Sequence, residues 1–186
     1  QTRPRRLNLP RLIKVGRNSR VTISAGRDHF PVYPSEIIHA VGDVFHHLRH
    51  LTLKNMKIGI VGLGIVGSAI KYGFEKLGHQ VTGHDIKDDT RLDDVLGSEV
   101  IYLCLPTPQG DDGHCDTSVI EEIAAELLDV QGFGGIIAIK STVTPGTTVL
   151  LQGRFMTEQI CHVPEFLRER AAIIDFTDNH DVCVIG

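Results

Sequence analysis

The chain has 186 residues, of which 41% are hydrophobic, and a formal net charge of −4 at pH 7. This length suits one domain with an appendage, and the apolar content is sufficient for a core. Apolar runs stay well short of the roughly 18 residues that a membrane span needs, and none follows the basic N-terminus, so we expect neither a span nor a signal peptide.

The charge is unevenly distributed along the chain. Residues 1–55 contain ten Lys or Arg against three Asp or Glu, whereas residues 56–186 contain nine against twenty. We therefore predict a basic N-terminal appendage over 1–55 and a separate domain over 56–186. Within the appendage, segments 12–15 and 21–24 indicate a hairpin, and 35–50 has the apolar stripe of a helix.

The appendage also raises two questions of binding. Its five histidines lack an acidic or cysteine partner, so we predict no metal site. Its arginines favour a solvated arm over contact with nucleic acid. The four cysteines of the chain show no paired spacing, which indicates a reducing, cytoplasmic setting.

From residue 57 onward, apolar strands alternate with amphipathic helices. This order predicts a doubly wound, Rossmann-type parallel sheet covered on both faces, with its ligand crevice at the carboxyl ends of the strands. The pattern leaves segment 92–96 open between a short strand and a loop. We expect strands at 57–61, 80–85, 100–105, 135–140, 159–163 and 181–185, and helices at 64–77, 117–129, 145–154 and 164–172.

A glycine pattern follows the first of these strands. It reads Gly62-x-Gly64-x-x-Gly67, and Asp85 ends the next apolar run. Gly62 permits a tight turn, Gly64 lets the backbone approach a pyrophosphate at the helix N-terminus, and Gly67 permits close packing of the helix. Asp85 can accept hydrogen bonds from the adenosine ribose and disfavours the 2′-phosphate of NADP, with Lys87 as a counterweight. The pattern predicts a dinucleotide site.

Polar residues follow three later strands. Pro106-Thr107-Pro108 forms a stiff turn that either packs against the cofactor or only terminates its strand; the residues alone leave both open. Ser141 and Thr142 offer hydroxyls for the nicotinamide ribose or for a water molecule. Glu165 and Glu169 would share one face of the expected helix 164–172, and capping of that helix is the alternative role for Glu165.

Four motifs in order carry a family resemblance. They are the glycine motif at 59–67, Cys-Leu-Pro-Thr-Pro at 104–108, Lys-Ser-Thr-Val-Thr-Pro-Gly-Thr-Thr at 140–148, and Pro-Glu-Phe-Leu-Arg-Glu-Arg-Ala-Ala-Ile-Ile-Asp-Phe at 164–176. This series resembles the NAD-binding domain of the UDP-glucose/GDP-mannose dehydrogenase family over residues 56–186. The resemblance implies NAD-dependent oxidation of the primary alcohol of a UDP- or GDP-sugar to a carboxylate, through a thiohemiacetal and a thioester on a cysteine.

The resemblance also implies a role for individual residues. Thr142 and Glu165 would hold and activate the water that hydrolyses the thioester, with Glu165 in acid–base steps. The substrate pocket would be lined by Glu165, Phe166, Leu167, Arg168 and Glu169. NAD would be contacted by Gly62, Leu63, Gly64, Ile65, Val66, Gly67, Asp85, Leu105, Pro106, Thr107, Pro108, Ser141 and Glu169.

The chain departs from the family pattern at two positions: Val163 stands where an Asn is usual, and Arg170 where many members have Gly. The family's nucleophilic cysteine lies beyond Gly186, so we expect a catalytically incomplete enzyme, either a fragment or a natural short version. The alternative is a non-enzymatic dinucleotide-binding or structural module, held in an oligomer or larger assembly through residues 1–55. A hydroxyacid or 6-phosphogluconate type of dehydrogenase ranks third, because it does not account for the motif at 164–169.

Overall fold

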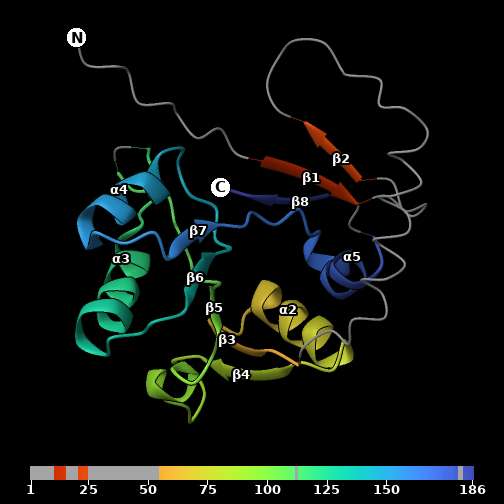
Figure 1. Cartoon of the computed structure of the whole chain (residues 1–186), viewed down its shortest axis with the longest axis horizontal. Coiled ribbons are helices and arrows are strands. Elements are labelled where there is room, and N and C mark those ends of the chain that lie inside the picture. The colour runs from red at the N-terminus through yellow and green to blue at the C-terminus, as the bar shows by residue number, and fades with distance from the viewer. Residues whose placement is uncertain (1–10, 16–20, 25–54, 112, 180–181) are drawn as a thin grey trace, which may run out of the picture. The chain divides into compact units, whose positions relative to one another are not determined.

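The computed structural model describes residues 11–15, 21–24, 55–111, 113–179 and 182–186, and Figure 1 draws its elements. The chain divides into two compact units, one of residues 1–54 with 181–183 and the other of residues 55–180 with 184–186. In the first unit, β1 (Arg11–Val15) and β2 (Val21–Ser24) pair antiparallel. The last strand of the chain is β8 (Val182–Ile185). The turn expected at 16–19 and the helix expected at 35–50 lie outside the described residues.

The second unit contains a five-stranded parallel sheet, which confirms the predicted fold class. The strand order is β4-β3-β5-β6-β7, so the order reverses at β3, and the crevice beside this strand is where doubly wound folds bind their ligands. The strands are β3 (Lys57–Val61), β4 (Gln80–His84), β5 (Val100–Leu103), β6 (Ile136–Ile139) and β7 (Ile160–His162).

Helices cover both faces of this sheet, because successive strand residues point to opposite sides. On one face Val61 packs with residues of α3 (Ser118–Ala125) and α4 (Thr147–Phe155). On the other face Ile60 packs with α2 (Ile65–Lys76), and α5 (Ala172–Thr177) adds Phe176. A π-helical turn, Glu126–Val130, continues α3.

The segment that the sequence left open is a 3-10 helix, η1 (Leu92–Val95). The carboxylate of Asp94 accepts the backbone N–H of Arg91 at 2.8 Å, which favours a helical turn at this point. Val95 is fully buried beside Gly59, where a Cβ would lie 3.0 Å from the Val95 Cβ. The segment therefore contributes to the core without extending the sheet beyond β4.

The helix expected at 164–172 is wrong in its first half. Residues 163–168 have no regular structure, and helical structure begins only with a 3-10 turn, Glu169–Ala171, before α5. The Glu165 carboxylate accepts the backbone N–H of Leu167 at 2.6 Å, a local bond that competes with helix formation. Glu165 and Glu169 consequently do not share a helical face.

Helix α5 docks on α2 at a glycine. A Cβ built on Gly73 would lie 2.4 Å from the ring of Phe176, so only glycine leaves room for this ring. Phe176 also meets Phe74 edge to face, with ring centroids 5.6 Å apart and planes at 78°. This contact fixes the segment that follows residue 168 against the first helix of the sheet unit.

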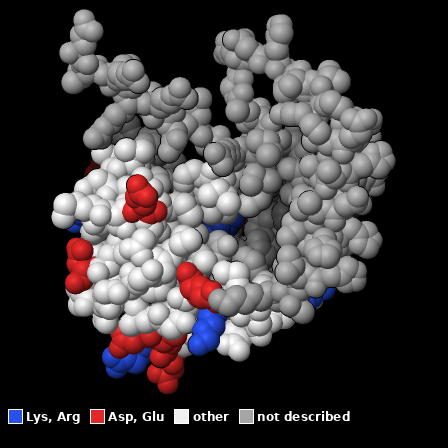
Figure 2. Space-filling view, in the orientation of Figure 1, with Lys and Arg blue, Asp and Glu red and all other residues white. Residues whose placement is uncertain are grey.

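Charged side chains are dispersed over the face of the described residues that Figure 2 shows. On the face shown in Figure 2, acidic side chains are scattered, with lysine or arginine beside some of them, and do not gather into one patch. Within the residues that the structure describes, no helix is long and apolar enough to cross a membrane.

Candidate dinucleotide site

The turn after β3 has a shape that only glycine allows at its first position. Gly62 has φ +92°, and a Cβ there would lie 2.3 Å from the backbone oxygen of Cys104. The N–H of Gly62 donates to the carbonyl of His84 at 2.8 Å. The predicted tight turn is therefore present, and it closes directly against the ends of β4 and β5.

The other two glycines differ in what surrounds them. A Cβ on Gly67 would lie 1.9 Å from the Gly62 oxygen, so the start of α2 packs tightly against the turn. A Cβ on Gly64 would meet no atom within 4 Å. Gly64 is the N-cap of α2 and lacks a side chain that could accept the first helical amides, and the first turn carries no acidic residue. Open space at an uncapped helix N-terminus suits a phosphate.

Asp85 is joined to the glycine turn. Its Oδ2 accepts the N–H of Leu63 at 2.7 Å, and its Oδ1 accepts the N–H of Lys87 at 3.0 Å. These amides, that of Lys87 foremost, hold the pKa of the Asp85 carboxyl below its usual value, so the group is ionised at neutral pH. A carboxylate has about four acceptor positions, and the two that these amides leave can receive ribose hydroxyls.

The loops after β5 and β6 are held together by hydroxyl groups. Ser141 Oγ accepts the N–H of Leu105 at 2.9 Å and donates to the Leu105 carbonyl at 2.7 Å. Thr107 Oγ1 donates to the carbonyl of Thr142 at 2.7 Å. The Pro-Thr-Pro turn is thus fixed to its neighbour as well as ending its strand, while the side chain of the exposed Thr142 stays at the surface.

Three residues that the sequence analysis did not assign to the site also gather at these strand ends. Lys140, only 7% exposed, donates from Nζ to the Pro164 carbonyl at 3.2 Å. The Nε2 of His162 lies 3.2 Å from the Ser141 carbonyl, and burial lowers the pKa of this imidazole. Burial raises the pKa of the Cys104 thiol to about 12, so this cysteine is protonated and a poor nucleophile. A lysine ending an apolar strand was the available signal.

Segment 163–168 carries the residues that the resemblance assigns to the substrate. Glu165 is half-buried and oriented by the Leu167 amide, whereas Phe166 is 69% exposed. Arg168 turns to Asp175, with Nε to Oδ2 at 2.9 Å and Nη2 to Oδ1 at 2.8 Å. Glu169 is exposed at the start of the 3-10 turn.

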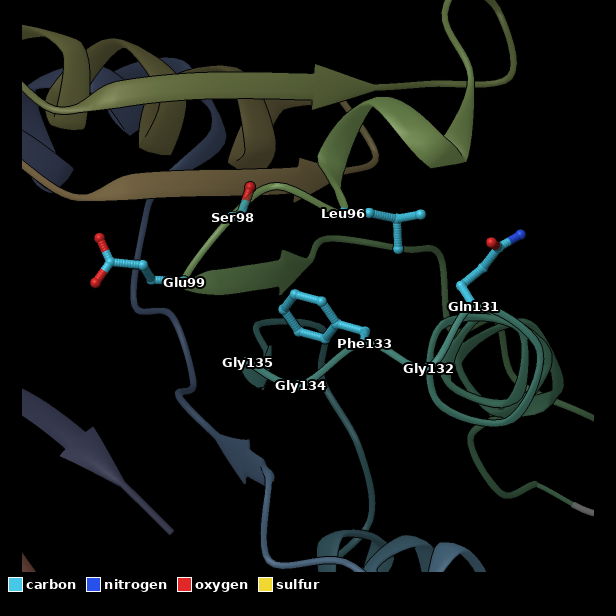
Figure 3. A pocket seen from close by; sticks show the side chains of 8 residues that line it. All are labelled: Leu96, Ser98, Glu99, Gln131, Gly132, Phe133, Gly134 and Gly135. Atoms are coloured by element: carbon cyan, nitrogen blue, oxygen red, sulfur yellow. The ribbon is translucent and has the colours of Figure 1, made fainter.

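A hollow lies at the opposite ends of the strands from the glycine turn and is drawn in Figure 3. It measures about 520 Å³ and is lined by Leu96, Ser98, Glu99, Gln131, Gly132, Phe133, Gly134 and Gly135. Glu99 and Gly135 precede β5 and β6, so this hollow lies at the amino ends of the strands. It is on the wrong edge for a dinucleotide. The described residues contain no group of three or more potential metal ligands.

The fold and the site define a class of protein. A dinucleotide-binding domain is defined by four features that this unit combines: a doubly wound sheet, a glycine turn where the strand order reverses, an uncapped helix N-terminus, and an ionised aspartate directly after the next strand. The family described as "UDP-glucose/GDP-mannose dehydrogenase family, NAD binding domain" matches residues 88–186. The chain belongs to this family and carries its NAD-binding domain.

Relatives and solved structures agree with this assignment. The UDP-glucose 6-dehydrogenase AglM of Haloferax volcanii is 34% identical over 110 residues, which are 52% of this chain and 25% of that protein. The UDP-glucose dehydrogenase of Pyrobaculum islandicum superimposes with a TM-score of 0.58 at 25% identity, over 65% of this chain and 38% of that one. The GDP-mannose dehydrogenase of Pseudomonas aeruginosa gives 0.54 at 25% identity, over the same 65% and 38%. The chain thus spans about a quarter of the first of these proteins.

Proposed function

We propose that this domain serves a nucleotide-sugar 6-dehydrogenase, which oxidises the primary alcohol of a UDP- or GDP-sugar to the carboxylate with NAD. The observation that carries the proposal is that two sets of residues lie at the carboxyl ends of the same parallel strands. The first set is the glycine turn with Gly64 and Asp85, and the second is the pair of loops after β5 and β6 that Ser141 joins. The named relatives that are dehydrogenases of nucleotide sugars support this function over a non-enzymatic module.

In this proposal the two sets divide the cofactor between them. The amides at the start of α2 would receive the pyrophosphate, and Asp85 would receive the hydroxyls of the adenosine ribose. Residues 105–108 and Ser141 would lie along the nicotinamide half, with Glu169 completing the contacts. NAD, when bound, supplies the hydride acceptor.

In the same proposal, Glu165 and Thr142 activate a water molecule beside the nicotinamide half of NAD. Glu165 has one carboxylate oxygen occupied by the Leu167 amide, which orients the other oxygen for accepting or returning a proton. The hydroxyl of Thr142 would hold the water, and residues 165–169 would line the sugar pocket. With Val163 in place of an amide, this pocket receives one hydrogen-bonding group fewer than the family pattern provides.

The proposal extends to the surroundings of the protein. All four cysteines are free thiols, which supports a reducing, cytoplasmic location. We also propose two parts, a basic appendage over 1–55 and the NAD domain over 56–186. The basic residues 1–55 would mediate contact with a second copy or another protein of an assembly.

Calorimetry on the intact chain tests the cofactor site. We expect NAD to bind, and NADP to bind about tenfold more weakly because Asp85 repels a 2′-phosphate.

Asp85→Asn should lower the affinity for NAD by about tenfold, since it removes charge-assisted hydrogen bonds to the ribose. Asp88→Asn, an exposed acid three residues away, is the matched control and should bind normally. Absence of binding to either cofactor would refute the assignment, and failure of the complete gene's product to reduce NAD with UDP- or GDP-sugars would refute the enzymatic part.

A further inference from the structure

Segment 164–168, which carries most of the residues proposed to line the sugar pocket, lies outside the helices and strands. It runs without regular structure between the end of β7 and the 3-10 turn at Glu169. Such a segment lacks the ladder of backbone hydrogen bonds that fixes a strand or helix, and it opens easily unless side chains hold it. Its position therefore depends on the contacts at its two ends.

The first end is held by a buried lysine. Lys140 follows β6, and the pairing of the Val163 N–H with the Ile139 carbonyl at 2.8 Å brings residue 163 alongside this strand end. From this position the Lys140 ammonium donates to the Pro164 carbonyl at 3.2 Å. Lys140 as a whole residue is 7% exposed, and a buried ammonium is costly unless it has acceptors, so its bond to the Pro164 carbonyl favours this position of the segment.

The second end is held by a buried aspartate. Asp175, also 7% exposed, accepts the backbone N–H of Arg168 at 3.0 Å in addition to two bonds from its guanidinium. The side-chain amide of Asn179 donates to the same carboxylate at 3.3 Å. Asp175 lies on α5, and the packing of the Phe176 ring over Gly73 anchors this helix on α2, so the bonds from Arg168 end on a packed helix.

We propose that Lys140 and Asp175 are positioning residues, which hold the two ends of segment 164–168 and thereby fix the carboxylate of Glu165 at the crevice. This inference rests on the proposed function for its catalytic meaning, but its geometry is independent of it. Lys140 and Glu165 both act on the pKa of the Cys104 thiol, in opposite directions, which is consistent with both charges lying near the end of β5.

The amide of Leu167 provides a direct measurement, because it donates to the Glu165 carboxylate. Hydrogen exchange of the full chain, resolved by residue with NMR, should show this amide exchanging about tenfold faster in Lys140→Met and in Asp175→Asn. Amides of β3 should keep the wild-type rate. Lys140→Arg should restore the protection, which a simple loss of packing would not explain.

Two surface pairs supply matched controls. Lys71→Met and Asp93→Asn remove partners of the exposed ion pairs Lys71–Glu75 and Arg91–Asp93, and should leave the Leu167 amide unchanged. If Lys140→Met or Asp175→Asn unfolds the sheet, Arg168→Met decides, because that side chain is 73% exposed and its loss removes two of the three hydrogen bonds from Arg168 to the Asp175 carboxylate. An unchanged Leu167 rate in the folded variants would overturn the proposal.

The exchange measurement uses no ligand, so its result is separable from the proposed function. If the wild-type chain binds no NAD and the variants still lose protection at the Leu167 amide, the proposed function is rejected and the positioning role of Lys140 and Asp175 is kept. If the wild-type chain binds NAD and both substitutions leave the Leu167 exchange rate unchanged, the function is kept and the positioning role is rejected.

Discussion

Two regions of one crevice are built by opposite means. The glycine turn, residues 62–67, can form only because Gly62 and Gly67 have no side chain, since a Cβ on either would overlap a backbone oxygen. The polar loops, residues 105–108, 141–144 and 164–168, owe theirs to side-chain groups that are present, chiefly the hydroxyls of Ser141 and Thr107 and the charges of Lys140 and Asp175.

The difference predicts how each region fails. An added methyl group in the glycine turn must displace backbone, which the surrounding close-packed strands resist. A hydroxyl removed from the polar loops leaves one or two backbone groups without a partner, at a moderate cost. We therefore expect substitutions in the glycine turn to have larger effects than substitutions in the polar loops.

Gly67→Ala should destabilise the domain by about 3 kcal/mol, because its Cβ would lie 1.9 Å from the Gly62 oxygen and the start of α2 would have to move. Urea unfolding followed by circular dichroism measures this change. Gly153→Ala in α4 is the matched control, since no atom lies within 4 Å of a Cβ there, and it should be neutral or stabilise by up to about 1 kcal/mol. Equal effects of the two substitutions would contradict the steric account.

Gly64→Ala should separate binding from stability. Its Cβ would meet no protein atom within 4 Å, so the free energy of unfolding should fall by no more than about 1 kcal/mol, the cost of alanine in place of glycine at an N-cap. The same methyl group would fill the space expected for the pyrophosphate, and NAD affinity should fall about thirtyfold, or roughly 2 kcal/mol. Unchanged affinity by calorimetry would place the phosphates away from the glycine turn.

Ser141→Ala should destabilise the domain by about 1 kcal/mol, because the N–H and carbonyl of Leu105 both lose their hydroxyl partner. Thr107→Val, which removes a single bond to the Thr142 carbonyl, should cost about half as much. Urea midpoints measure both. A loss as large as that of Gly67→Ala would break the contrast between the two regions.

The smallest effect concerns pH and involves His162, the last residue of β7, which contacts the polar loops at the Ser141 carbonyl. The pKa of His162 lies below its usual 6.5 in the folded state, so the unfolded chain takes up the proton at the higher pH. This contribution to stability is complete above about pH 6.5 and declines as the pH falls toward the folded-state pKa. His162→Gln should lose less stability than the wild type between about pH 7.5 and 5.5. Identical pH dependence of the two proteins would contradict the assignment.

The sequence predicted the glycine turn well because its geometry is encoded locally. The need for glycine at 62 and 67 arises within a few residues of the strand end, and the acid on the next strand follows from the alternation of strands and helices. The parallel sheet could be predicted for the same reason, because the alternation of strands and helices is visible in the sequence. Segment 92–96 stayed undecided because a short apolar run suits either a strand or a turn, and only the burial of Val95 beside Gly59 settles it.

The polar loops were less predictable because their bonds join distant residues. Ser141 and Leu105 are 36 positions apart, and Lys140 and Pro164 are 24 apart. Pro164 followed by Glu165 resembles a helix start, yet Glu165 binds the Leu167 amide and Asp175 binds the Arg168 amide, and both interactions delay the helix. Tertiary partners therefore overrode a local pattern.

The docking of Phe176 over Gly73 has a consequence for the birth of the protein on the ribosome. These residues are far apart in sequence, and their contact closes one face of the sheet over Phe74. A contact of such long range forms only after the whole intervening chain has been synthesised. Until residue 176 has left the exit tunnel, the aromatic side of α2 stays uncovered, and a nascent chain stalled before that point would expose Phe74 to chaperones.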